Sequence, residues 1–202
     1  MWNRAENKVN CIFIRHGATA SNRQHRYLGR TDEELDEAGI LAIKQSIDEG
    51  YYDKLLSDKS VQIKVFSSPM KRCMQTARLI YPKAQIEIID ELSEMDFGDF
   101  ELKNYEELSN DPLCAGVYQA WIDSGGTSAF PNGESREAFI KRSVSGLKKA
   151  MSRMDTAANS QKTAVFVVHG GTIMAIMSHY CGGNYFDYQV KNGEGLRCTL
   201  SI

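Results

Sequence analysis

Residues 9–22 constrain the fold of this chain more than any other stretch. They open with an apolar run of strand length, V-N-C-I-F-I, which continues directly into Arg15, His16 and Gly17. A run this apolar is typical of a strand inside a sheet that is covered on both faces. Ligands of open α/β sheets bind at the carboxyl edge of such strands, so the three residues are candidates for a binding site. On its own, however, Arg-His-Gly is more often an ordinary strand end.

A second strand end has the same layout. The most hydrophobic run of the chain, at 163–168, is followed by His169 and Gly170 and then by a helical pattern that reaches Cys181 and stops at Gly182. We predict that this strand is central in the sheet. Two buried strands that each end in a histidine and a glycine would place both imidazoles at one sheet edge.

Strand-like and helix-like segments alternate along most of the chain. Short apolar runs predict further strands at 63–66 and 86–89, and residues 185–190 and 196–202 predict a hairpin that closes the edge of the sheet. Alternation of strands with helices is typical of a parallel sheet. We therefore expect an α/β fold in three layers, with a mostly parallel central sheet and helices on both faces.

Three longer helices are expected between these strands. The first runs from Asp36 to about Glu49 and the third follows Ser135; both Asp36 and Ser135 suit an N-cap. For the second, Ser68 is the expected cap and Pro69 the first helical residue, because proline lacks the N–H that has no partner at that position.

The alternation stops between about 95 and 133, where two short helices are predicted at 105–110 and 116–122. We expect this segment to be a small helical cap that folds over the site. Between 95 and 135 the chain has eight acidic residues and one basic residue, Lys103, which predicts a cap that repels multiply charged anions. The segment also holds aromatic residues, about half of which are expected to pack the cap and the others to face a substrate. They are Phe97, Phe100, Tyr105, Tyr118, Trp121 and Phe130.

Composition narrows the class of protein. The chain has 202 residues, 42% hydrophobic and 25% charged, which is typical of a single globular domain, here 1–202. The formal net charge of −2 gives no electrostatic reason to expect nucleic acid or an anionic membrane as a partner. Five widely spaced cysteines without a C-x-x-C pair predict neither a disulfide framework nor a zinc site. The polar N-terminus and apolar runs well short of the roughly 20 residues that span a bilayer predict a cytoplasmic location.

Taken together, the motifs at the predicted strand ends resemble those of the histidine phosphatase superfamily, the phosphoglycerate mutase-like phosphatases and mutases. In chain order they are R-H-G-A-T-A-S-N at 15–22, G-R-T-D-E-E-L at 29–35, S-S-P-M-K-R at 67–72, L-S-E-M-D-F-G at 92–98, P-N-G-E-S at 131–135 and H-G-G at 169–171. One departure is Leu102, where the family usually has glycine. Y-L-G-R-T-D at 27–32 looks most like the α-ribazole phosphatases and related small-metabolite phosphatases.

The resemblance implies a phosphatase reaction that needs neither a metal nor a cofactor. His16 would attack phosphorus and form a phosphohistidine, and Glu94 would act first as general acid and then as general base. The catalytic set that the resemblance implies is completed by Arg15, Arg72 and His169. As residues that bind the substrate it implies Arg15, Thr19, Asn22, Gly29, Arg72, His169 and Gly170.

The residue types point to the same chemistry. Two arginines and two histidines at one sheet edge describe a site for a dianion such as phosphate. Neighbouring positive charge also keeps an imidazole neutral and therefore nucleophilic. The expected partner is a small phosphorylated metabolite, with α-ribazole 5′-phosphate as one candidate.

Two alternatives stay open. One is a 2,3-bisphosphoglycerate-dependent phosphoglycerate mutase, and the other is a non-catalytic phosphate-binding module on the same fold. The second would be expected to lack the nucleophile or the acid, whereas both His16 and Glu94 are present. The pattern leaves the oligomeric state open, and also the roles of His25, Arg26 and Arg30 in the polar loop after the first motif.

Overall fold

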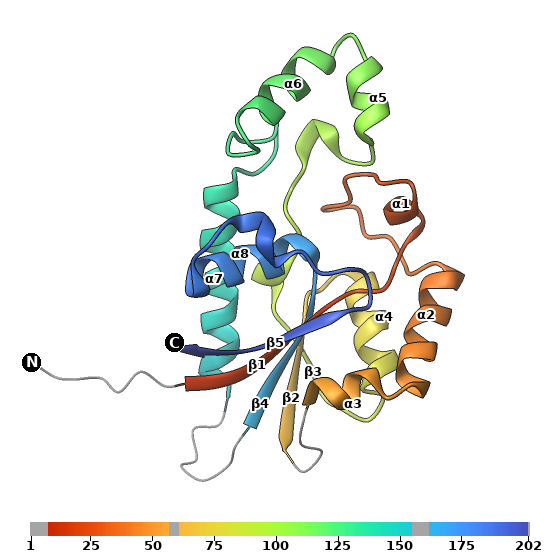
Figure 1. Ribbon diagram of the computed structural model, residues 1–202, viewed down its shortest axis with the longest axis vertical. Coiled ribbons are helices and arrows are strands. Elements are labelled where there is room, and N and C mark those ends of the chain that lie inside the picture. The colour runs from red at the N-terminus through yellow and green to blue at the C-terminus, as the bar shows by residue number, and fades with distance from the viewer. Residues whose placement is uncertain (1–7, 57–60, 155–161, 202) are drawn as a thin grey trace, which may run out of the picture.

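A five-stranded sheet forms the centre of the protein (Figure 1). The computed structural model describes residues 8–56, 61–154 and 162–201, so most of the polar N-terminus and the last residue of the final predicted strand lie outside the described residues. The strands follow the order β3-β2-β4-β1-β5 and comprise β1 (Lys8–Arg15), β2 (Gln62–Ser67), β3 (Ile86–Ile88), β4 (Lys162–Val168) and β5 (Gly195–Ser201). All neighbours are parallel except β5, which runs antiparallel to β1. β4 is central, as predicted.

The register of β1 and β4 determines where the site lies. Arg15 pairs with Val168, so the residues that follow, His16 and His169, leave the sheet side by side at its carboxyl edge. The amide of His16 donates to the carbonyl oxygen of Val168 over 2.9 Å. The two imidazole rings then meet edge to face, with 5.2 Å between their centroids.

Helices cover both faces of the sheet. The α-helices are α1 (Ala20–Arg23), α2 (Glu37–Asp48), α3 (Tyr51–Leu56), α4 (Lys71–Ile80), α5 (Tyr105–Asn110), α6 (Ala115–Asp123), α7 (Arg136–Ser152) and α8 (Gly170–Cys181). Short 3-10 turns occur at η1 (Asp90–Leu92), η2 (Gly98–Phe100) and η3 (Tyr185–Tyr188). Within the described ranges, no helix combines the length and the apolar character needed to cross a bilayer.

Alternating side chains along the strands produce the three layers. On β1, Phe13 faces α7 and α8, whereas its neighbour Ile14 faces α2, α3 and α4; both are fully buried. Phe166 on β4 stacks on Phe13 from one side and Phe66 from the other, at centroid distances of 4.9 and 5.3 Å. The predicted fold, with a mostly parallel sheet between two helical layers, is confirmed.

Two local predictions are wrong. The predicted edge hairpin does not form, because residues 185–188 are the 3-10 turn η3 and β5 pairs with β1. The side chains of Asn184 and Asp187 close a capping box around that turn, which favours a helical over an extended backbone. Ser68 does not cap the next helix either: α4 begins at Lys71, after Met70 as N-cap.

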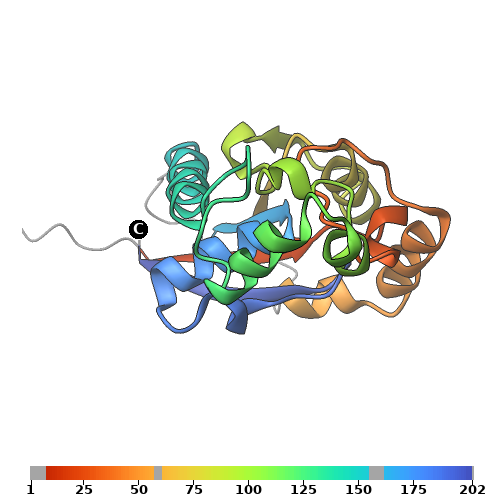
Figure 2. The ribbon, with the colours of Figure 1, turned by 90° about the horizontal axis from the view of Figure 1, so that it is seen from above.

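The segment predicted as a cap packs on itself above the sheet edge. η2, α5 and α6 surround a small apolar core that contains Phe100, Leu108 and Tyr118 and reaches Phe139 of α7. The helices at 105–110 and 115–123 match the predicted ones closely. Seen from above, the cap helices lie over the middle of the molecule (Figure 2). The organisation of the chain as a single domain stays a prediction.

Candidate active site

His16 is a buried imidazole whose tautomer follows from its contacts. Its Nδ1 lies 2.7 Å from the carbonyl oxygen of Gly17, and a carbonyl oxygen can only accept, so Nδ1 carries the proton. Nε2 therefore keeps a free lone pair. Burial, and then the positive charges of Arg72 and Arg15, hold the pKa of His16 well below its usual 6.5. The ring is neutral at physiological pH and can act as a nucleophile.

Glu94 lines the same cavity as His16 and is also buried. Its Oε1 accepts from the amide of Met95 over 2.9 Å, and its Oε2 accepts from the amide of Gly171 over 3.2 Å. Burial raises the pKa of Glu94 above 4.5, against the opposing effect of these amides and of the nearby arginines. A carboxyl group with a raised pKa is suited to donate a proton.

His169 is fully buried behind His16 and both of its ring nitrogens have partners. Arg72 Nε donates to Nδ1 over 3.3 Å, so Nε2 carries the proton and donates to Ser68 Oγ over 2.7 Å. Burial and the charge of Arg72 hold the pKa of His169 well below its usual value. Ser68 thus orients the second histidine, a role that sequence reasoning missed although the residue follows β2 at the same sheet edge.

Arg72 is fully buried, and most of its hydrogen bonds go to backbone carbonyl oxygens. Its guanidinium donates to the carbonyl oxygens of Thr31 and Gly29, both over 2.8 Å, besides its bond to His169. It therefore ties the loop after α1 to the site and supplies positive charge from behind. Arg72 and His169 do not line the cavity, so their predicted contacts with a phosphate stay predictions.

Arg15 and Asn22 line the cavity floor. Arg15 Nη1 donates to the carbonyl oxygen of Val190 over 2.9 Å, while its Nε is buried without a hydrogen-bond partner among the described residues. Asn22 Oδ1 accepts from the side chain of Asn192 over 3.1 Å, which leaves the NH₂ group of Asn22 for another partner. Asn192 was missed at the sequence level; it also donates to the backbone of His16.

Two predicted substrate-binding residues support the site from outside the cavity. Thr19 is fully buried and caps α1, where its side chain accepts from the amide of Asn22. Gly29 donates its amide to Glu101 over 2.9 Å, and a Cβ at this position would meet the Met95 carbonyl oxygen at 2.1 Å. Gly170, in contrast, is part of the cavity lining.

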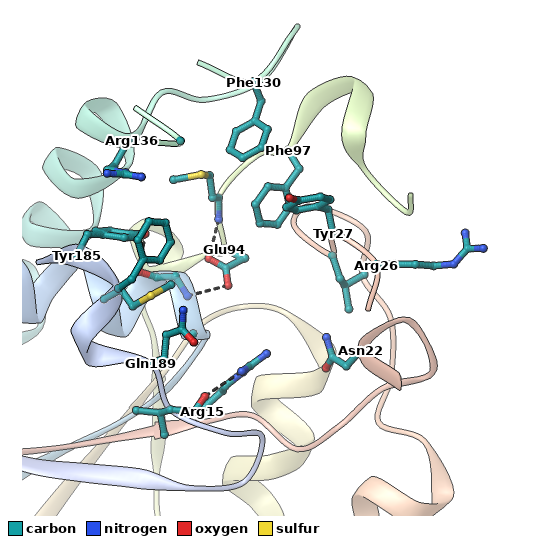
Figure 3. A pocket seen from close by; sticks show the side chains of 18 of the residues that line it. Arg15, Asn22, Arg26, Tyr27, Glu94, Phe97, Phe130, Arg136, Tyr185 and Gln189 are labelled. Carbon is teal, nitrogen blue, oxygen red and sulfur yellow. Dashed lines mark hydrogen bonds between the residues drawn. The ribbon is translucent and has the colours of Figure 1, made fainter. Parts of the chain in front are cut away.

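The cavity itself measures about 520 Å³, enough for a phosphate and a ring-sized leaving group (Figure 3). Of the six cap aromatics, three line it and the others do not, as the sequence predicted. Further aromatic rings come from outside the cap and were missed. The aromatic lining consists of Phe97, Trp121 and Phe130 from the cap and Tyr27, Tyr185 and Phe186 from elsewhere.

None of the acidic cap residues lines the cavity, so the repulsion of anions by the cap stays a prediction. Most are engaged elsewhere: Glu101 accepts from the amides of Gly29 and Thr31, and Glu134 binds Arg142. The lining contains Glu94 as its acid and four basic residues, Arg15, Arg26, Arg136 and Lys191.

The sequence left the roles of three loop residues open, and the structure places each of them differently. Arg26 lines the cavity, but its guanidinium is ion-paired with Glu107 and points away from the cavity in Figure 3. Arg30 is largely exposed and ion-paired with Asp96 over 3.0 Å. His25 has a positive φ of 54° in the turn after α1. Within the described part of the chain, no group of three or more His, Cys, Asp or Glu side chains could hold a metal ion.

The chain is similar to known proteins in sequence and in fold. Residues 11–194 match the model of the histidine phosphatase superfamily (branch 1). The chain belongs to the histidine phosphatase superfamily, and it is a phosphatase. It is 29% identical to an adenosylcobalamin/alpha-ribazole phosphatase of Salmonella typhimurium over 82% of this chain and 76% of that protein. It is 30% identical to the uncharacterized phosphatase PhoE of Bacillus subtilis, over 85% and 77%. The crystal structure of the alpha-ribazole phosphatase from Shigella flexneri shares the fold, with a TM-score of 0.73, 24% identity, and 96% and 95% of the two chains covered.

Proposed function

We propose that this phosphatase hydrolyses a small phosphorylated metabolite without a metal ion, through a phosphohistidine on His16. The observation that carries the proposal is the tautomer of His16. Its Nδ1–H is bound to the Gly17 carbonyl oxygen, its low pKa keeps it uncharged, and Nε2 is free to attack. A neutral imidazole held among arginines is suited to nucleophilic attack on a phosphate dianion.

In the proposed first step, His16 Nε2 forms a bond to phosphorus as the bond to the leaving oxygen breaks. The guanidinium of Arg15 and the side-chain NH₂ group of Asn22 would hold the equatorial oxygens, with Arg72 and His169 as charged and polar support. Glu94 gives its proton to the leaving oxygen. In the second step the Glu94 carboxylate takes a proton from water, whose oxygen displaces the imidazole and releases phosphate.

α-Ribazole 5′-phosphate is the first substrate to test. Two observations support it: relatives of this chain carry the name alpha-ribazole phosphatase, and the cavity wall is rich in aromatic rings that suit a ring-bearing leaving group. Neither observation depends on the other.

The test is to trap the intermediate. Incubation with a ³²P-labelled phosphomonoester and rapid quenching should label the protein, and a phosphohistidine is stable in alkali and decays in acid. His16→Ala should abolish the label and the turnover of p-nitrophenyl phosphate, while His179→Ala, which changes an exposed histidine of α8, should leave both unchanged. Wild-type activity in His16→Ala, or an acid-stable label, would contradict the mechanism.

The same preparation separates the two alternatives. A non-catalytic module would release no phosphate from any ester. A mutase would convert 3-phosphoglycerate, with 2,3-bisphosphoglycerate present, faster than it hydrolyses every monoester tried. Full activity in excess EDTA is expected, and a strict requirement for added Mg²⁺ would contradict the metal-independent proposal.

A further inference from the structure

The far end of the cavity carries an arginine that the proposed reaction does not use. Arg136, the first residue of α7, lines the same cavity as His16 and Glu94. Figure 3 shows Arg136 and Arg15 on opposite sides of the Glu94 carboxylate. The proposed general acid, Glu94, must lie close to the leaving oxygen of the substrate. The part of the substrate that extends beyond Glu94 towards Arg136 is therefore the leaving group.

The guanidinium of Arg136 is held in place by the protein. Its Nη2 donates to the carbonyl oxygen of Gly125 over 2.6 Å. Its central carbon lies 4.8 Å from the ring centre of Tyr185 and 5.0 Å from that of Phe186, at cation–π distance. A side chain ordered in this way loses little further freedom when a ligand binds.

Among the residues that the structure describes, no neighbour neutralises the charge of Arg136. In the part of the chain that the structure describes, no carboxylate forms an ion pair with it. Glu134, two residues earlier, binds Arg142 over 2.8 Å. Glu137, the next residue, is exposed and lies outside the lining of the cavity.

The other basic residues of the lining are placed differently. Arg26 is ion-paired with Glu107. Arg15 donates to Val190 at the phosphate end, and Lys191 follows Val190 directly in the chain. Arg136 is therefore the cation of the lining that faces the leaving group.

We propose that Arg136 forms a second subsite that binds a carboxylate, so that the preferred substrates are phosphomonoesters whose leaving group carries one. One N–H of the guanidinium donates to the carbonyl oxygen of Gly125. The remaining N–H donors of the planar group match the two coplanar oxygens of a carboxylate. A tetrahedral phosphate dianion would need several converging donors, which the end of the cavity at Arg15 offers. The subsite rests on the proposed function, because the ester phosphate is bound at Arg15. Esters without a second anionic group, α-ribazole 5′-phosphate among them, would be poorer substrates.

Binding of two matched phosphonates tests the subsite. 4-Carboxybenzylphosphonate and 4-carbamoylbenzylphosphonate have the same shape and differ in the charge of the distal group. By isothermal titration calorimetry, the wild-type protein should bind the carboxylate about tenfold more tightly, as a charge-assisted bidentate contact implies. Arg136→Gln should remove this preference and leave the affinity for the carbamoyl compound within about twofold. Lys141→Gln, which removes an exposed charge of the same helix outside this cavity, should keep the preference.

Each other outcome overturns the subsite. Equal wild-type affinities for the two compounds, no binding of either, or a preference that survives in Arg136→Gln would show that the guanidinium does not bind a carboxylate. An equal loss of affinity for both compounds in Arg136→Gln would show that Arg136 acts in the packing of the cap instead. Phosphonates are not cleaved, so their binding tests the subsite independently of the proposed reaction. If the preference is present but no phosphomonoester is hydrolysed, the proposed function fails and the subsite does not.

Discussion

Replacing Gly171 with alanine should displace the proposed general acid. A Cβ atom at this position would lie 2.3 Å from Glu94 Oε1 and 3.1 Å from its carboxyl carbon. Ordinary carbon–oxygen contacts begin at about 3.3 Å, so the carboxylate has to move by about 1 Å. A displacement of that size in a reacting group costs on the order of 100-fold in rate. We therefore expect Gly171→Ala to lower kcat for an alkyl ester such as glycerol phosphate about 100-fold.

The loss should depend on the leaving group. p-Nitrophenolate leaves without a proton, so p-nitrophenyl phosphate should lose only a few-fold under the same steady-state assay. Gly116→Ala is a matched control, because Gly116 holds the equivalent second position of α6 and a Cβ there would meet nothing within 4 Å. Thermal unfolding should show both variants folded, since alanine suits a helix better than glycine. Unchanged kcat on glycerol phosphate, or equal losses on both esters, would refute the reasoning.

Three further predictions concern the acid, the pH dependence and one turn. Glu94→Gln should slow alkyl esters ~10²–10⁴-fold and p-nitrophenyl phosphate far less; equal losses would point to a structural role. Because the pKa of His16 lies well below 6.5 and the pKa of Glu94 lies above 4.5, kcat/KM should rise with pH below pH 6.5 as His16 loses its proton and should fall again as Glu94 ionises. Glu94→Gln should abolish the falling limb in the pH–rate profile, and an unchanged limb would assign it to another group. Leu102 has a φ of +59°, a conformation that costs a non-glycine residue roughly 1 kcal/mol, so Leu102→Gly should raise the free energy of unfolding in urea; a decrease would contradict this account.

The sequence alone determined the layered fold and the location of the site. Strands at 9–14 and 163–168 could be predicted because burial on both faces demands unbroken apolar runs, which a local pattern displays. The histidines that end them had to meet, because parallel neighbours present their carboxyl ends at one edge. The helix that follows Ser135 was readable from its N-cap residue, and the short cap helix at 105–110 was predicted as well.

Predictions from hydrophobic pattern and residue type were wrong where one side-chain hydrogen bond determined the local backbone or the role of a residue. Residues 185–188 look like a strand by composition, but Asn184 and Asp187 close a capping box that holds them in a 3-10 turn. Ser68 has the residue type of a helix cap, yet its hydroxyl is bound to His169, 101 residues further along the chain.

How the site residues are oriented depends on the tertiary structure. The tautomer of His169 depends on Arg72 and Ser68, and the direction of the Asn22 amide depends on Asn192, 170 residues away. Composition also could not show that the cap's carboxylates lie outside the cavity lining whereas Arg136 is part of it. Periodicity and capping act over a few neighbouring residues, and so they can be read from the chain. Charge pairing and hydrogen bonding in a site depend on distances that exist only after distant segments have packed together.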